Sequence, residues 1–126
     1  MEPLDLVMSF CEAWSEGSDV DKLVDFFTED ATYHNIPIEP VKGRDAIKAT
    51  INGFMTGVDK MEFEVKHAAV NGSVVMTERV DRFFFPGHTV ALPVMGTFEV
   101  SDGKITAWRD YFDLNQFMSQ MPGPAS

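Results

Sequence analysis

The chain has 126 residues, a length typical of one domain, so residues 1–126 are expected to fold as a single unit. Its formal net charge of -10 argues against binding nucleic acid or anionic lipid, because no basic patch offsets the repulsion between like charges. With 11 Phe and 8 Met residues, the chain is rich in side chains that line apolar pockets, which favours a small neutral or apolar ligand.

The cysteine count and the hydropathy of the chain indicate the cellular compartment in which the protein is expected. Cys11 is the only cysteine, so no intrachain disulfide can form, and its helical spacing with Leu4, Val7 and Trp14 predicts a buried position. No basic region precedes the first apolar residues, and no segment approaches the roughly 20 apolar residues that span a bilayer. We expect a cytoplasmic protein that does not enter a membrane.

The first half of the chain predicts three helices. An apolar stripe predicts the first over residues 3–17, with Pro3 in its first turn. Ser18 is the expected N-cap of a second helix, whose apolar side runs over residues 20–27. The spacing of apolar residues predicts a third helix over residues 43–57.

Strands are expected mainly in the second half. Residues 31–35 are compatible with a short early strand, and two prolines make residues 36–40 an extended loop. After Lys60 the apolar pattern alternates, and Gly-containing turns divide it into an antiparallel meander. We predict an α+β fold in which three N-terminal helices pack on a strongly curved, mostly antiparallel sheet, followed by a flexible tail over residues 121–126. The four predicted strands cover residues 60–70, 74–85, 89–100 and 104–112.

Charged residues interrupt two apolar strand faces. Arg79 and Asp81 lie about 6 to 7 Å apart on one face of their strand, within reach of an ion pair. If Asp110 reaches the same concave face, the two carboxylates share one guanidinium and hold one proton between them, which supplies an acid and a base. The alternative is a surface salt bridge, with Asp110 at a sheet end. Aromatic neighbours on the same faces favour burial: Phe83, Trp108 and Phe112.

Two further polar residues share a face if residues 31–35 are extended. Tyr33 and Asn35 each offer a donor and an acceptor, so together they can orient a water molecule. The alternative is an Asx-type turn into the following loop. The three histidines are far apart in sequence and in no ligand motif, so neither a metal nor a cofactor is predicted.

The chain resembles the limonene-1,2-epoxide hydrolase family in three fragments that follow one another in the same order. They are Tyr33-His34-Asn35, Glu78-Arg79-Val80-Asp81 and Trp108-Arg109-Asp110-Tyr111-Phe112-Asp113. Gly43-Arg44-Asp45-Ala46 and Asp102-Gly103-Lys104-Ile105-Thr106 look similar too, and the resemblance spans roughly residues 4 to 118.

The resemblance implies a cone-like fold of the nuclear-transport-factor-2 and ketosteroid-isomerase type, commonly a homodimer with a deep pocket. It also implies one-step addition of water to a small apolar epoxide, which gives a vicinal diol without a covalent intermediate. By position, Asp110 would be the base for a water held by Tyr33 and Asn35. Asp81 would be the acid, and Arg79 would bridge the two carboxylates.

The remaining wall of the pocket is expected from apolar residues on the same faces, although each could be plain core instead. Two other functions stay open: an isomerase or polyketide cyclase on this fold, and a non-catalytic module that binds small ligands. Arg79 argues against an isomerase, which has no need of a guanidinium between two carboxylates. The candidate wall residues are Phe54, Val58, Phe83, Leu92, Val94, Met95, Trp108, Phe112 and Phe117.

Overall fold

The computed structural model describes residues 1–15 and 19–121. The predicted end of the first helix at Gly17 and most of the predicted tail lie outside these residues. The elements in chain order are α1 (Pro3–Ser15), α2 (Val20–Val24), β1 (Phe27–Asn35), β2 (Val41–Lys42), α3 (Arg44–Met55), β3 (Lys60–Asn71), β4 (Val74–Phe85), β5 (His88–Ser101), β6 (Lys104–Tyr111) and α4 (Leu114–Gln120).

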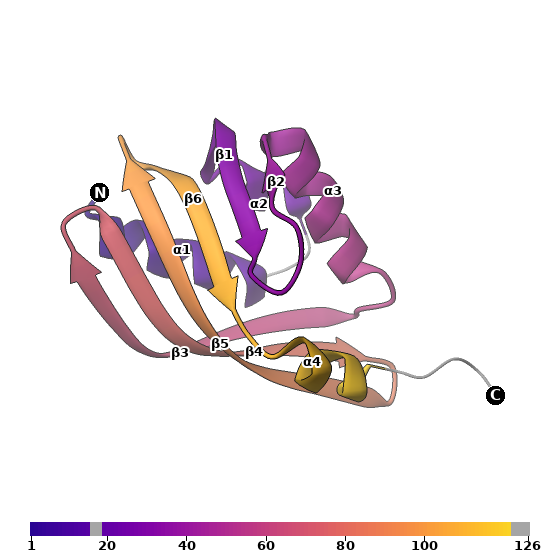
Figure 1. Ribbon diagram of the computed structural model, residues 1–126. Coiled ribbons are helices and arrows are strands. Elements are labelled where there is room, and N and C mark those ends of the chain that lie inside the picture. The colour runs from indigo at the N-terminus through magenta and orange to yellow at the C-terminus, as the bar shows by residue number, and fades with distance from the viewer. Residues whose placement is uncertain (16–18, 122–126) are drawn as a thin grey trace.

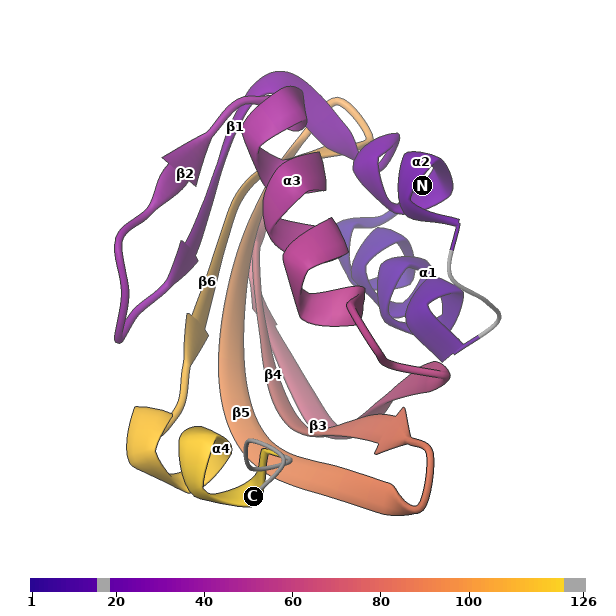
Figure 2. The same cartoon turned by 90° about the vertical axis from the view of Figure 1, so that its right-hand side faces the viewer.

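The strands form one sheet in the order β2-β1-β6-β5-β4-β3. All neighbours are antiparallel except β1 and β6, which run parallel. The sheet is strongly curved (Figure 1), and α1 and α3 lie on its concave side while α4 lies at the lower end beside β5 (Figure 2). The predicted class of three N-terminal helices on a curved, mostly antiparallel sheet is confirmed.

The meander forms where the alternation of apolar residues predicts it. Each observed end of β3, β4, β5 and β6 lies within one residue of the predicted one. In the turn between β5 and β6, both Asp102 and Gly103 have positive φ, 50° and 75°, the backbone that favours tight hairpins. The residues of the turns and the two-residue alternation of apolar side chains therefore determine where the strands of this half begin and end.

The second helix is shorter than predicted. It ends at Val24, and Phe27, expected on its apolar side, instead begins β1 and is fully buried. Pairing of β1 with β6 satisfies the backbone polar groups of this segment, and this tertiary interaction overrides the helical spacing. Asp19 caps the helix through its side chain, which accepts from the backbone N–H of Asp21, in place of Ser18, which lies outside the described residues.

Two elements were not predicted. β2 pairs with β1 and has only two residues, which is too few to show an alternation of apolar and polar residues. α4 has no buried residue and follows the N-cap Asp113, whose side chain accepts from the N–H of Gln116. It is held at the edge of β5 by Gln120: Nε2 donates to the Ala91 carbonyl at 2.9 Å, and the Ala91 N–H donates to Oε1 at 3.1 Å.

The core is largely aromatic. Trp108 lies between Tyr33 and Phe98, with ring centroids at 4.3 Å and 5.5 Å and planes within 8° and 14° of parallel. Cys11 is buried as predicted, and burial raises the pKa of its thiol to about 12, so it is a neutral core side chain. Among the described helices, none has both the length and the apolar character needed to cross a membrane.

Candidate active site

Arg79 lies on the concave face of β4 between two carboxylates. Its Nε and Nη2 donate to the two oxygens of Asp81, both at 2.9 Å. Nη2 also donates to Oδ2 of Asp110 at 2.8 Å, and Nη1 to Oδ1 of Asp110 at 3.2 Å and to the hydroxyl of Thr77 at 3.1 Å. The predicted cluster is therefore a buried ion-pair network, and the surface salt bridge considered as its alternative is not what the structure has.

Strand register explains how residues on β4 and β6 meet across β5. Gly96 on β5 lies opposite Thr77 on one side and Asp110 on the other. A Cβ atom at Gly96 would overlap Nη1 of Arg79 and lie 2.7 Å from Oδ1 of Asp110 and 3.0 Å from the Thr77 hydroxyl. The guanidinium thus crosses β5 at the one position where the strand carries no side chain, a role that glycine commonly has inside strands.

The network combines one positive charge with two carboxylates away from solvent. Arg79 is 1% exposed, and Asp81 and Asp110 are each 4% exposed. Burial disfavours the charged form of Arg79, but Asp110 and Asp81 outweigh it and hold its pKa well above the usual value. The guanidinium carbon also lies 4.8 Å from the ring centroid of Phe63, a cation–π distance that adds to its stability.

Burial changes the titration of Asp81. Desolvation raises the pKa of Asp81 to about 6; Arg79 opposes this shift, and the charge of Asp110 adds to it. Near pH 6 about half of the molecules therefore carry a proton on Asp81. Asp110 accepts a further hydrogen bond, from Nε1 of Trp108 to its Oδ1 at 2.7 Å.

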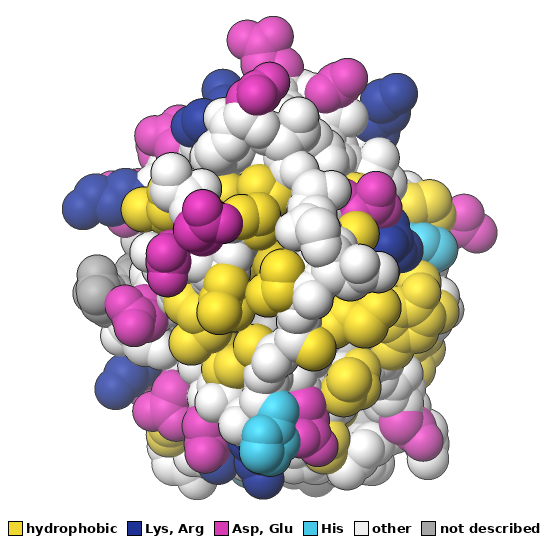
Figure 3. Space-filling model, turned by 90° about the vertical axis from the view of Figure 1, so that its left-hand side faces the viewer, with side chains coloured by type: hydrophobic (Ala, Val, Ile, Leu, Met, Phe, Trp, Pro, Cys, Tyr) yellow, Lys and Arg dark blue, Asp and Glu magenta, His cyan; other side chains and the backbone are white. Residues whose placement is uncertain are grey.

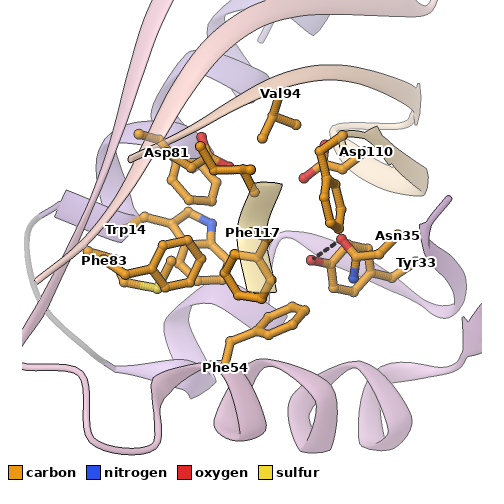
Figure 4. Close-up of a pocket in the computed structure, with 13 residues that line it drawn as sticks. Trp14, Tyr33, Asn35, Phe54, Asp81, Phe83, Val94, Asp110 and Phe117 are labelled. Atoms are coloured by element: carbon orange, nitrogen blue, oxygen red, sulfur yellow. Dashed lines mark hydrogen bonds between the residues drawn. The ribbon is translucent and has the colours of Figure 1, made fainter. Parts of the chain in front are cut away.

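Tyr33 and Asn35 reach the same site from β1. The parallel register with β6 sets Tyr33 beside Trp108 and Asn35 beside Asp110. The Tyr33 hydroxyl donates to Oδ1 of Asn35 at 3.2 Å, an interaction visible in Figure 4. Burial and the charge of Asp110 raise the pKa of Tyr33 well above its usual value, so it is a neutral phenol that can donate. The extended strand, not an Asx-type turn, positions the pair.

A pocket opens in front of these side chains, with about 390 Å³ of space when its open mouth is included. Asp81, Asp110, Tyr33 and Asn35 line it together, and α4 contributes Phe117, which lies between Phe83 and Tyr33 in Figure 4. Six of the predicted wall residues line the pocket: Phe54, Phe83, Leu92, Val94, Phe112 and Phe117.

Three predicted wall residues lie elsewhere. Trp108 is fully buried in the core, where its contribution is the hydrogen bond to Asp110. Met95 is 50% exposed on the outer face, since alternation along β5 turns Val94 inward and Met95 outward. Val58 follows α3 in a turn closed by its N–H bond to the Met55 carbonyl, and its half-buried side chain packs against the core.

Three residues of the wall were missed: Trp14, Met61 and Phe63. The signals were present, because Trp14 is on the apolar stripe of α1 and Met61 and Phe63 share one face of β3. What the sequence lacked was the curvature that brings α1 and β3 to the same cavity as β4. Within residues 1–15 and 19–121, no group of three or more His, Cys, Asp or Glu side chains is arranged to hold a metal ion.

Gly96→Ala should displace the guanidinium of Arg79, because the new methyl group occupies its position. Such overpacking reduces the free energy of unfolding by about 1 to 3 kcal/mol. The indole N–H resonance of Trp108, which is bonded to Asp110, should shift as well. Urea unfolding measures the change in stability, and ¹⁵N–¹H spectra measure the shift of the indole resonance.

Gly53→Ala is the matched control, because it lies on the exposed face of α3 with no atom within 4 Å of the new Cβ. Unchanged stability and an unchanged Trp108 resonance in Gly96→Ala would contradict the role given to Gly96.

Sequence comparisons show the family to which the chain belongs. Residues 1–123 match the family described as "Limonene-1,2-epoxide hydrolase catalytic domain". The protein named Epoxide hydrolase EphG, from Mycobacterium tuberculosis, is 33% identical over 99 residues, which cover 79% of this chain and 66% of that protein, just under two thirds of its length.

Solved structures share the fold. An LEH-like epoxide hydrolase from M. tuberculosis has a TM-score of 0.80 at 29% identity, with 94% of this chain and 87% of that chain covered. SalBIII, described as an epoxide hydrolase/cyclase-like enzyme in pyran ring formation in the polyether salinomycin, has a TM-score of 0.80 at 22% identity, with 90% and 92% covered. With the family match extending over nearly the whole sequence, the chain belongs to the limonene-1,2-epoxide hydrolase family.

Proposed function

We propose that the protein is an epoxide hydrolase that adds water to an epoxide in one step and releases a vicinal diol. The observation that carries the proposal is a buried guanidinium held between two carboxylates, Asp81 and Asp110, at the wall of an apolar pocket. Family membership supports it, as does the relative named as an epoxide hydrolase. The substrate is a small apolar epoxide, and the reaction needs neither a metal nor a cofactor.

Each side chain has one part in the proposed reaction. Tyr33 and Asn35 hold the attacking water, and Asp110, which pairs with Asn35 in the sheet register, takes its proton. The water oxygen forms a bond to one epoxide carbon as the C–O bond of that carbon breaks. Asp81 donates its proton to the departing epoxide oxygen, so the ring opens to a neutral diol. The raised pKa of Asp81 supports this role, because an acid must carry its proton near neutral pH.

The physical advantage comes from moving both protons in one transition state. Water is a weak nucleophile and an alkoxide a poor leaving group, and each correctly placed acid or base contributes about 10²- to 10⁴-fold in rate. Fixing the water adds an orientational gain. After turnover Asp81 is ionised and Asp110 is protonated, so one proton must pass from Asp110 back to Asp81, through solvent in the pocket. Arg79 stays charged and holds the two carboxylates throughout.

The alternatives make less use of this site. An isomerase needs a lone base and an oxyanion donor, and the guanidinium between two carboxylates serves neither purpose. A cyclase would use the same acid and base with a hydroxyl group of the substrate in place of water, and Tyr33 and Asn35 beside Asp110 favour a separately held water. A binding module would have no use for a buried charge network of this kind.

Asp110→Asn and Asp81→Asn should each reduce hydrolysis of cyclohexene oxide by at least about 10²-fold, since each removes one proton transfer. Diol formation by gas chromatography measures the rate, and far-ultraviolet circular dichroism checks that each variant is folded. Asp102→Asn, at the exposed turn between β5 and β6, is the matched control and should retain full activity. Full diol formation by either site variant would contradict the mechanism, and wild-type protein that forms no diol from a panel of epoxides would contradict the function.

The one-step character has its own check with the same substrate. In a single turnover in ¹⁸O-water, the wild-type protein should incorporate the label into the first diol formed. An unlabelled first diol would mean that a carboxylate attacks the epoxide and forms an ester, which is a different mechanism.

We propose a homodimer in which the outer face of the sheet is the interface. Met76, Met95 and Tyr111 are 48%, 50% and 47% exposed there, and Met95 lies beside Tyr111 across β5 and β6. Hydrophobic side chains gather on this face, with charged side chains around them (Figure 3). Exposed apolar side chains gathered on one face often mark a protein interface.

Light scattering after size-exclusion chromatography should give twice the chain mass of 14.1 kDa. Met95→Glu should shift the protein towards the monomer, because a charge at the centre of the patch cannot be buried without a partner. Met118→Glu, at a 58% exposed position in α4 and outside the sheet, should leave the dimer intact. A monomeric wild-type protein at micromolar concentration would refute the proposed dimer.

A further inference from the structure

The indole N–H of Trp14 is buried without a hydrogen-bond partner. Trp14 is 1% exposed, and its Nε1 is one of two buried side-chain polar atoms among the described residues that make no hydrogen bond. The other tryptophan, Trp108, donates to Asp110. Buried donors in folded proteins are almost always paired with protein, water or ligand, so an unpaired one calls for a partner that the protein itself does not provide.

Trp14 lines the pocket, and its orientation is fixed. Its ring stacks on Phe63, with centroids 4.7 Å apart and planes within 13° of parallel, and forms a T-shaped pair with Phe10 at a centroid distance of 6.1 Å. In Figure 4 its nitrogen faces the space between Asp81 and Phe117. The indole cannot rotate to find another acceptor without losing this packing.

None of the described residues accepts a hydrogen bond from this nitrogen, although Asp81 lies on the same side of the pocket. Apart from Asp81, Asp110, Tyr33 and Asn35, every lining residue described other than Trp14 is apolar. A wholly apolar ligand in this pocket would leave the Trp14 N–H without an acceptor, as it is in the free protein, which is unfavourable. A ligand with an oxygen at the same place restores the hydrogen bond.

We propose that Trp14 is a specificity-determining residue whose N–H binds a second oxygen of the substrate, a carbonyl, ether or hydroxyl separate from the epoxide. The inference rests on the proposed epoxide hydrolase function and names its substrate class: epoxides that carry an additional hydrogen-bond acceptor. The epoxide oxygen itself is assigned to Asp81, so the two oxygens of the substrate are recognised by different groups. Trp14 acts in binding and takes no proton.

The kinetic test uses two epoxides of nearly equal shape, the ring epoxides of 4-acetylcyclohexene and 4-isopropenylcyclohexene. They differ by a carbonyl oxygen in place of a methylene group. Wild-type protein should favour the acetyl compound in kcat/KM, and Trp14→Phe should reduce that preference by about 2- to 10-fold, the range expected for one neutral hydrogen bond. Because the preference is a ratio of two kcat/KM values, a loss of packing that lowers both values equally does not change it.

Met61→Leu is the matched control, since Met61 lines the same pocket, has no donor and is replaced by a side chain of similar volume. Its ratio of kcat/KM for the two substrates should equal that of the wild type. An unchanged ratio of the two kcat/KM values in Trp14→Phe would overturn the proposal, because the indole N–H would then not distinguish the two substrates.

A binding test is independent of turnover. In ¹⁵N-labelled wild-type protein, cyclohexyl methyl ketone should move the indole N–H resonance of Trp14 downfield, whereas isopropenylcyclohexane, with no oxygen, should not. The missing peak in Trp14→Phe assigns the resonance, and Trp108 gives the second indole signal. Equal responses to both compounds would overturn the proposal. If neither epoxide is hydrolysed, the proposed function fails, and this spectrum still decides the role of Trp14.

Discussion

The ion-pair network of Arg79 constrains the rest of the site. A guanidinium taken fully out of water is stable only when its donors and its charge are matched, and removing one partner from such a buried pair costs about 3 to 5 kcal/mol. Here Asp81, Asp110 and Thr77 accept the hydrogen bonds that the guanidinium of Arg79 donates, and the ring of Phe63 lies 4.8 Å from its carbon. With two carboxylates for one cation, the site keeps a surplus negative charge, which favours the retention of a proton.

The topology explains why this network occurs beside a pocket. Curvature of the sheet opens a cavity on the side of α1 and α3, and parallel pairing of β1 with β6 brings Asn35 next to Asp110. Gly96 leaves room for the guanidinium to cross β5. The acid, the base and the groups that can hold water therefore come from three strands, β4, β6 and β1, which the hydrogen-bonded sheet holds in fixed register.

Much of this arrangement could be predicted from local pattern. Alternation places Arg79 and Asp81 on one strand face without any structure, and Gly-containing turns fix the hairpins. The parallel pairing of β1 could not be predicted, since it depends on contacts far apart in sequence, and Phe27 was assigned to a helix for that reason. Gly96 and Trp14 were missed because their roles depend on atoms from other strands and helices. Gly96 has no side chain where the guanidinium of Arg79 crosses β5, and the indole N–H of Trp14 has no hydrogen-bond acceptor.

The central claim is that burial, together with the charge of Asp110, raises the pKa of Asp81 towards neutral pH against the opposing effect of Arg79, so that part of the molecules keep a proton on Asp81. The most direct measurement is a pH titration of the side-chain carboxyl carbons in protein labelled with ¹³C-aspartate, with Asp81→Asn used to assign the Asp81 signal. The account predicts that Asp81 titrates with a pKa of about 6. A titration at the ordinary aspartate value of 3.8 would contradict it, because Asp81 would then be ionised near neutral pH and could not act as the acid.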